Sequence, residues 1–186
     1  MRPRVWSRSK RSSPAAWAIG LGLAVALVGA GLWFDGTASP LSGRAQVTDG
    51  DTLRLAGQRV RLTGLDAPEL AQTCIDGDGR EWSCGAEARV FLTELLKGKE
   101  VSCRRSGRDA YRRVLASCIA DGQDVGTRIV GAGWAVAEFA YGPEQGEARA
   151  ARRGIWSGSF ATPVEWRHSH GIGTPTVWEW IRSWFQ

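Results

Sequence analysis

The longest apolar segment of this chain is a run of 20 residues from Ala15 to Phe34, which contains no charged or strongly polar side chain. As a helix that rises about 1.5 Å per residue, the run would reach about 30 Å, the thickness of the hydrocarbon layer of a bilayer. Trp17 and Trp33 lie near its ends, where indole rings favour the membrane interface. The run therefore predicts a membrane-spanning helix at residues 14–34 rather than a core helix.

The segment before this run, residues 1–13, carries five basic residues and no acidic one. Such an excess of positive charge favours retention of that side in the cytoplasm, so we expect everything after residue 34 to lie outside it. We favour an uncleaved single-pass anchor in the cell membrane. The alternative is a signal segment cleaved after small residues near Ala30 or Ala38, which would leave a secreted protein.

The formal net charge of +5 arises from the same N-terminal segment. Five of the 24 basic residues lie in residues 1–13, and the remaining 19 equal the 19 acidic residues of the chain. Residues 14–186 are therefore formally neutral. This balance excludes a generally basic surface for nucleic acid and limits such contacts to local groups of arginines.

All four cysteines follow the apolar run, and an even number in an exported domain indicates disulfides. Three pairings are possible. We prefer Cys74–Cys84 and Cys103–Cys118, because each pair is local and the second would join neighbouring strands of a predicted hairpin. A zinc site is the competing interpretation, but no C-x-x-C spacing occurs, and both histidines lie far away in sequence.

The exported part divides into a linker at 35–42, a domain at 43–167 and a Trp-rich tail at 168–186. Apolar residues alternate from Gly43 onward in five short segments, which predict strands. Between the third and fourth strands, apolar residues recur at helical spacing until Gly98. A second helix is expected from Asp124 and a third from Pro143 to Gly154. The order predicts an α+β fold, a five-stranded Greek-key β-barrel of the OB-fold type with about three helices.

Three clusters of charged residues fall at the predicted strand ends. Their sequences are Thr48-Asp49-Gly50-Asp51-Thr52, Arg61-Leu62-Thr63-Gly64-Leu65-Asp66-Ala67-Pro68-Glu69, and Asp109-Ala110-Tyr111-Arg112-Arg113. Carboxylates from separate turns are the ligands that a hard cation such as calcium requires. Guanidinium groups nearby suit a phosphodiester whose oxygens gain charge during attack.

Together the clusters resemble the thermonuclease family, the staphylococcal-nuclease-like domains, in its cysteine-containing exported bacterial form. Their order and spacing are those of the family, and residues 124–134, 139–141 and 154–156 match its helical half. The resemblance covers roughly residues 43–166. It implies one Ca²⁺ ion held by Asp51, Asp66 and the backbone carbonyl of Ala67, with Asp49 just outside these ligands.

The resemblance also implies the roles of the remaining site residues. Glu69 would act as general base or orient the attacking water, while Arg61 and Arg113 would neutralise the phosphate and the transition state. Tyr111, Phe139 and Tyr141 match positions where the family places rings beside the nucleotide. Phe139 stands where a tyrosine is usual, so a hydroxyl contact would be missing there.

From these observations we expect a calcium-dependent hydrolase, a monomeric nuclease that cleaves phosphodiester bonds of DNA or RNA outside the cytoplasmic membrane. Preference between DNA and RNA and between endo and exo cleavage stays open. Two other classes compete: a non-catalytic nucleic-acid-binding OB-fold module, and an envelope-associated or polysaccharide-associated assembly factor.

If the protein is an assembly factor, the Trp-rich tail at 168–186 would be its docking element. Trp178, Ile181, Trp184 and Phe185 would share one face of a helix. Such a face could dock on the barrel, lie at a membrane interface or bind a protein partner. His168 and His170, which precede it, are expected to be exposed to solvent.

Overall fold

The computed structural model describes residues 40–171. The expected anchor at residues 14–34 and the Trp-rich face at 178–185 lie outside the described residues. Within residues 40–171, none of the helices has the length and apolar character that crossing a membrane requires.

Most strands of the described part belong to one sheet. Its order is β1 (Leu41–Gly43), β8 (Val101–Arg108), β9 (Val114–Ala120), β4 (Gln58–Leu62), β3 (Thr52–Leu55) and β2 (Gln46–Val47), and β10 (Gln123–Asp124) pairs with β9 as well. The pair β4–β9 is parallel, and the other pairs are antiparallel. Two small sheets join β5 (Leu65–Asp66) to β11 (Val136–Ala137) and β6 (Cys74–Ile75) to β7 (Glu81–Trp82).

The five predicted strand regions are present, but the predicted closed five-stranded barrel needs correction. The described strands are more numerous, and the sheet order is open, with β1 and β2 at its ends. Residues 44 and 45 connect these two strands, so the chain itself links the ends of the sheet without a hydrogen-bonded ladder between them. Gly43, with φ of +147°, allows the chain to turn there.

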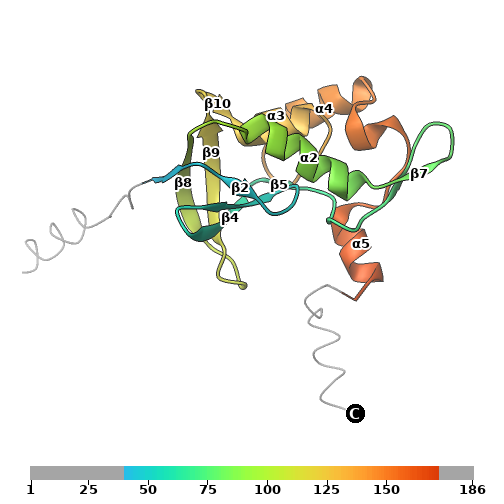
Figure 1. The fold of residues 1–186 in the computed structure, drawn as a ribbon. Coiled ribbons are helices and arrows are strands. Elements are labelled where there is room, and N and C mark those ends of the chain that lie inside the picture. The colour runs from blue at the N-terminus through green and yellow to red at the C-terminus, as the bar shows by residue number, and fades with distance from the viewer. Residues whose placement is uncertain (1–39, 172–186) are drawn as a thin grey trace, which may run out of the picture. The chain divides into compact units, whose positions relative to one another are not determined.

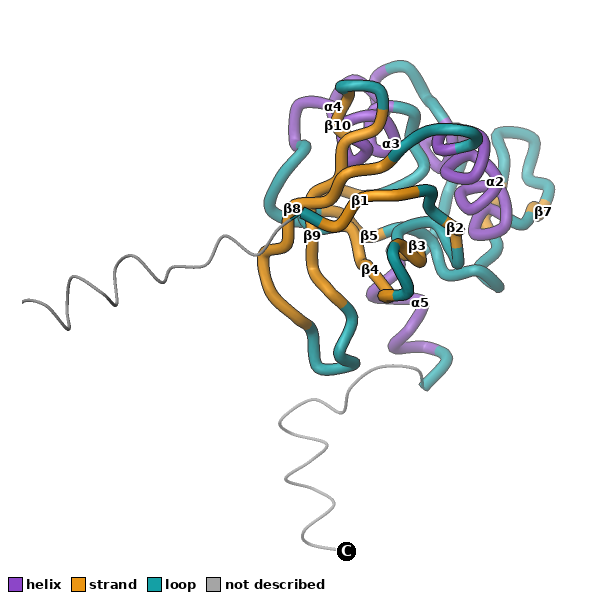
Figure 2. Tube along the Cα trace, turned by 60° about the vertical axis from the view of Figure 1, so that its left-hand side comes forward, coloured by secondary structure: helices purple, strands orange, loops and turns teal. Residues whose placement is uncertain are grey.

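The core lies between the sheet and the helices grouped at one end of it (Figures 1 and 2). Alternating residues of β8 and β9 point into the core, among them the buried Val101, Cys103, Ala116 and Cys118. In α2 (Cys84–Leu96), residues at helical spacing (Ala88, Leu92 and Leu96) are buried, and Leu92 and Leu96 belong to the same core cluster. This is the pattern expected of a helix with one apolar face.

Helix α3 (Val125–Gly131) begins where it was expected, because the side chain of Asp124 accepts a hydrogen bond from the backbone N–H of Thr127. Helix α4 (Gly142–Ala150) ends earlier than expected. Arg152 adopts a φ of +50°, which no helix accommodates, and a 3₁₀ turn follows at Gly154–Ser157.

A further helix, α5 (Pro163–Ser169), was not expected and corrects the number of described α-helices from three to four. Its N-terminus is a capping box in which Thr162 and Glu165 bond to each other's backbone N–H, with Pro163 in the first turn. Figure 1 shows α5 lying apart from the other three helices.

Both preferred disulfides, Cys74–Cys84 and Cys103–Cys118, are present, and the described residues contain no free cysteine. Cys103 and Cys118 are directly opposite each other in the β8–β9 pair, as the predicted hairpin required. The zinc alternative is therefore wrong, because all four thiols are used.

The turn that carries Glu69 packs closely against the first turn of α2. A Cβ atom at Gly85 would lie 1.7 Å from the carbonyl oxygen of Glu69. The backbone N–H of Gly85 donates to the carbonyl of Gln72, at the other end of the same turn. Only glycine permits this approach.

We therefore expect Gly85→Ala to destabilise the protein by about 1–3 kcal/mol, because the added methyl group forces the two segments apart. The matched control is Gly146→Ala in α4, where an added Cβ meets nothing within 4 Å; it should stabilise by about 0.5–1 kcal/mol. Chemical denaturation of both variants measures the difference. Equal stability of the two would contradict the close approach.

Candidate active site

The predicted acids come from the turn between β2 and β3 and from the end of β5 with the turn that follows it. Asp49 and Asp51 lie between β2 and β3, where the Asp49 carboxylate accepts the backbone N–H of Asp51 at 3.1 Å. The backbone carbonyl of Asp51 accepts from the N–H of Leu62 at 2.8 Å. This bond fixes Asp51 beside β4, and therefore beside Arg61.

Arg61 joins two buried carboxylates from these turns. Its Nη1 lies 2.6 Å from Oδ2 of Asp51, and its Nη2 lies 2.6 Å from Oδ1 of Asp66. The side chain of Asp51 is 6% exposed and that of Asp66 only 1%. The structure thus brings the two predicted metal ligands to one point, where a single positive group contacts both.

The electrostatics of Asp51 reflect this burial. Removal from water raises the pKa of Asp51 to about 7, although Arg61 and a hydrogen bond from Thr52 act in the opposite direction. For Arg61, burial disfavours its charge, yet the attraction of Asp51 and Asp66 prevails, and the pKa of Arg61 lies above its ordinary value. Burial therefore destabilises the Asp51 carboxylate more than Arg61 and Thr52 stabilise it.

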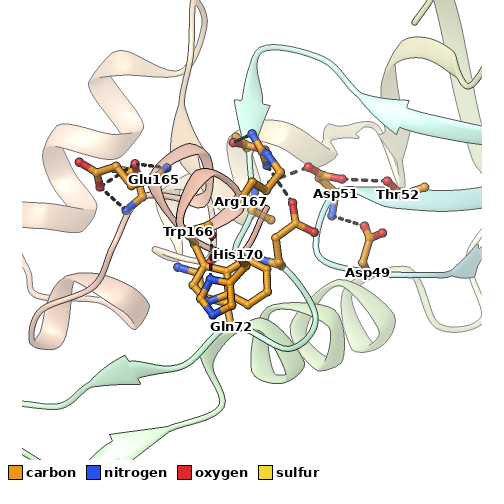
Figure 3. A network of polar contacts seen from close by, with 12 residues as sticks. Asp49, Asp51, Thr52, Gln72, Glu165, Trp166, Arg167 and His170 are labelled. Carbon is orange, nitrogen blue, oxygen red and sulfur yellow. Dashed lines mark hydrogen bonds and ion pairs between the residues drawn. The ribbon is translucent and has the colours of Figure 1, made fainter. Parts of the chain in front are cut away.

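A third arginine, Arg167 of α5, was missed by the sequence reasoning. It donates to Asp66 through both terminal nitrogens and to Glu69 through Nη1. Figure 3 draws Arg167 and Asp51 in one network of polar contacts. The hydrogen bond to Asp66 is the main reason why the pKa of Arg167 is raised. The capping box at Thr162 was the one sequence signal for α5, but no local pattern indicated where the helix docks.

Arg113 is held on the other side of the site. Its Nε lies 2.6 Å from the carboxylate of Asp109, which also accepts the backbone N–H groups of Tyr111 and Arg113. These bonds lower the pKa of Asp109 against the opposing effect of its burial. Arg113 Nη1 lies 3.5 Å from Thr52 Oγ1, so the terminal nitrogens face the turn that carries Asp51.

A cavity of about 670 Å³ connects these groups. Of the predicted residues it is lined by Asp49, Asp51, Arg61, Ala67, Glu69, Tyr111 and Arg113. Asp66 lies beneath this surface, covered by Arg61 and Arg167. Val164, Arg167 and His168 of α5 form part of the wall, and both His168 and His170 are exposed, as expected.

Two of the three predicted aromatic positions do not line the cavity. Phe139 is 80% exposed. The ring of Tyr141 is partly buried against Gly126, where an added Cβ would lie 2.3 Å from the tyrosine ring. Burial, followed by the nearby charge of Asp124, raises the pKa of Tyr141 to about 12. Tyr111 alone faces the cavity, 61% exposed, with the Arg113 guanidinium 5.5 Å from its ring centroid.

The donor set fits a divalent cation. Within residues 40–171, no three His, Cys, Asp or Glu side chains form a metal-binding group. The expected set, however, needs only two carboxylates and a carbonyl oxygen. Asp51 and Asp66 already share one positive partner, Arg61, so their oxygens lie near one point. Carboxylate and carbonyl oxygens are the ligands that Ca²⁺ prefers.

The amino-acid sequence is similar to one protein family and to several known proteins. Residues 59–158 match the family model described as "Staphylococcal nuclease homologue". The chain is 38% identical to the succinoglycan biosynthesis protein ExoI of Rhizobium meliloti over 128 residues, which cover 65% of this chain and 67% of that protein. It is 34% identical to an uncharacterized endonuclease of Escherichia coli over 135 residues, 66% and 82% of the two chains.

A fungal protein shows the same likeness at greater distance. The probable endonuclease LCL3 of Colletotrichum graminicola is 30% identical over 145 residues, which cover 67% of this chain and 51% of that protein. Helix α5 lies beyond the residues that the family model matches.

The burial of Tyr141 can be tested by its titration. The chain has two tyrosines, so Tyr111→Phe leaves Tyr141 as the single phenol. We expect its absorbance change near 295 nm to be centred at about pH 12, because burial opposes the phenolate. Since the unfolded phenol ionises near pH 10, the contribution of Tyr141 to stability should be constant below pH 10 and be lost as the pH rises toward 12. A titration centred near pH 10 in the folded protein would contradict this packing.

Proposed function

The chain belongs to the staphylococcal nuclease family, and from this we propose that it is a calcium-dependent nuclease that hydrolyses phosphodiester bonds of DNA or RNA outside the cytoplasmic membrane. The observation that carries the proposal is the shared contact of Arg61 with the buried Asp51 and Asp66, beside Glu69 in one cavity. Family membership and the endonuclease names of relatives support nuclease activity.

The cation would be held by Asp51, Asp66 and the backbone carbonyl of Ala67. When bound there, Ca²⁺ supplies Lewis-acid stabilisation of the phosphate oxygens and a template for the attacking group. Asp49, whose carboxylate accepts the N–H of Asp51, would hold the turn in place without being a ligand.

Glu69 is suited to take the proton of an attacking water. Its side chain is 33% exposed and lines the cavity, so water can reach it. A carboxylate on the cavity wall close to Asp66 can orient the water toward a phosphorus atom held between the cation and the arginines. This assignment rests on position and on the resemblance of the Asp66–Glu69 segment to the family motif.

Arg61 and Arg113 would stabilise the charge that develops on phosphate. The ion pair of Arg113 with Asp109 uses Nε, and Nη1 makes only a long contact of 3.5 Å with Thr52, which leaves Nη2 for a phosphate oxygen. Tyr111, exposed next to Arg113, offers a face on which a base can stack, a contact that contributes about 1–3 kcal/mol. Phe139 and Tyr141 do not line the cavity, so we assign them no base contact.

The location proposed here is supported by the two disulfides. Disulfides form and persist outside the reducing cytoplasm, in agreement with the anchor proposed at residues 14–34. One comparison favours a second candidate function. Because a relative is named a succinoglycan biosynthesis protein, a role in the production of envelope polysaccharide is the alternative that we retain.

Replacement of the proposed base separates an enzyme from a binding module. We expect Glu69→Gln to lower the rate of DNA cleavage by about 10²–10⁴-fold, because the amide cannot accept the proton of the attacking water. Arg113→Ala should lower it by about 10²–10³-fold through loss of charge stabilisation. DNA affinity, measured by fluorescence anisotropy, should change much less than the rate. The control is Glu87→Gln, on the exposed face of α2.

Three other results would contradict the proposed nuclease mechanism or the polysaccharide role. Equal loss of cleavage and binding would favour the non-catalytic module. Cleavage that persists in chelator and in Glu69→Gln would remove the proposed mechanism. Unaltered polysaccharide production in cells that carry Glu69→Gln would argue against a polysaccharide role that depends on the nuclease site.

Calcium binding tests the ligand set directly. We expect Asp51→Asn to abolish measurable Ca²⁺ binding in isothermal titration calorimetry of the full chain, because the site loses one of its two carboxylates. Asp121→Asn, at an exposed turn that pairs with Lys99, should bind Ca²⁺ like the unaltered protein. Full calcium affinity in Asp51→Asn would show that the cation is held elsewhere.

A further inference from the structure

The site receives one arginine from beyond the C-terminal end of the part of the chain that the family model matches. Arg167 lies on α5 (Pro163–Ser169), whereas the match ends at residue 158. We propose that Arg167 is a positioning residue for the reaction: it holds Glu69 beside Asp66, in the orientation in which Glu69 can accept a proton. This inference rests on the proposed nuclease function.

Arg167 binds two carboxylates through its two terminal nitrogens. Nη2 lies 2.9 Å from Oδ2 of Asp66, and Nη1 lies 3.1 Å from Oδ1 of Asp66 and 2.8 Å from Oε1 of Glu69. Planar guanidinium-to-carboxylate pairs of this kind are short, strong and directional. Arg167 therefore fixes the direction of Glu69 relative to a carboxylate that is itself almost completely buried.

A single buried amide fixes the base of α5 to the turn of Glu69. Gln72, with no exposed surface, donates through Nε2 to the carbonyl of Ala161 at 2.6 Å. Its Oε1 accepts from the backbone N–H of Glu69 at 3.2 Å. The side chain of Gln72 thus connects Ala161, which precedes the capping box, to Glu69, the residue proposed as base.

The helix itself is well defined despite its short length. Its first turn is closed by the capping box of Thr162 and Glu165. Near its end, the imidazole of His170 stacks on Trp166 with ring centroids 4.1 Å apart. Arg167 follows Trp166 directly, so stabilisation on both sides limits the movement of the guanidinium.

Electrostatics explain why Glu69 needs such a partner. Asp51, Asp66 and Glu69 gather three carboxylates within reach of Arg61 and Arg167. Without Arg167, repulsion by Asp66 would favour rotation of the partly exposed Glu69 toward solvent. The Arg167 contact uses Oε1. Among residues 40–171, Oε2 of Glu69 has no hydrogen-bond partner, so this oxygen is available to a water molecule.

The contact of Arg167 with Asp66 also determines whether removal of Arg167 strengthens or weakens Ca²⁺ binding. Arg167 donates to both oxygens of Asp66, a proposed calcium ligand. A positive charge at this place opposes a second cation. Removal of Arg167 should therefore strengthen Ca²⁺ binding while it weakens catalysis, two changes in opposite directions that a general loss of structure does not produce.

The experiment compares Arg167→Gln, Arg167→Lys and the control Arg89→Gln, on the exposed face of α2, in the full chain. Cleavage of a fluorescein-labelled single-stranded DNA oligonucleotide gives kcat and KM. Calorimetry gives the Ca²⁺ dissociation constant, and thermal unfolding checks the fold. For Arg167→Gln we expect kcat to fall about 10–100-fold, KM to change little and the Ca²⁺ dissociation constant to decrease. Arg167→Lys should recover part of kcat, because it keeps the charge but not the fork.

Three results would overturn the proposal. An unchanged or higher kcat with tighter calcium binding would make Arg167 a competitor of the cation only. A parallel loss of kcat, calcium binding and thermal stability would make it a structural residue. Full recovery of kcat by lysine would show that charge, not orientation, matters. If the unaltered protein cleaves no DNA, the nuclease function fails, while the calcium titration still decides whether Arg167 restrains Asp66.

Discussion

The shared contact of Arg61 with Asp51 and Asp66 is the constraint on which the rest of the site depends. Two carboxylates in the interior each lose several kcal/mol of hydration, and their ion pairs with Arg61 and Arg167 recover only part of it. The pKa of Asp51 remains at about 7, above that of an ordinary aspartate. Apolar residues would fill this space at lower cost, so stability alone gives no reason for the two buried acids. Their arrangement makes sense if a cation completes it.

The fold maintains this contact through its backbone, not through the side chains alone. Thr52 and Arg61 are register partners in the β3–β4 pair, and Leu62 donates to the carbonyl of Asp51. Asp66 is fixed separately, because it pairs with Val136 in the small β5–β11 sheet. Two sheets thus present one carboxylate each to the same arginine. The third acid, Glu69, follows on a turn held by Gly85 and Gln72.

Features that depend on neighbours in sequence could be predicted. Alternating apolar residues located the strands, Asp124 marked the start of α3, and the short spacing of the cysteines indicated both disulfides. The sequence reasoning failed where distant segments meet. Arg167 and Asp66 are 101 residues apart, and Gln72 bonds to a carbonyl 89 residues away. A capping box predicts that a helix begins, but which surface it packs on depends on shape and charge that no local pattern encodes. The open ends of the sheet were missed for the same reason.

The balance of charges in the cavity determines how it can bind a nucleic acid. The walls carry the acids Asp49, Asp51, Glu69 and Asp109 and the arginines Arg59, Arg61, Arg113 and Arg167, four of each sign, with Asp66 buried below them. Residues 14–186 are neutral as well, so no wider field attracts a polyanion. A bound divalent cation would turn this cavity from slightly negative to positive. In such a site the cation would govern substrate affinity as well as the chemical step, and Arg167, which pairs with both Asp66 and Glu69, would keep these two acids together until the cation binds.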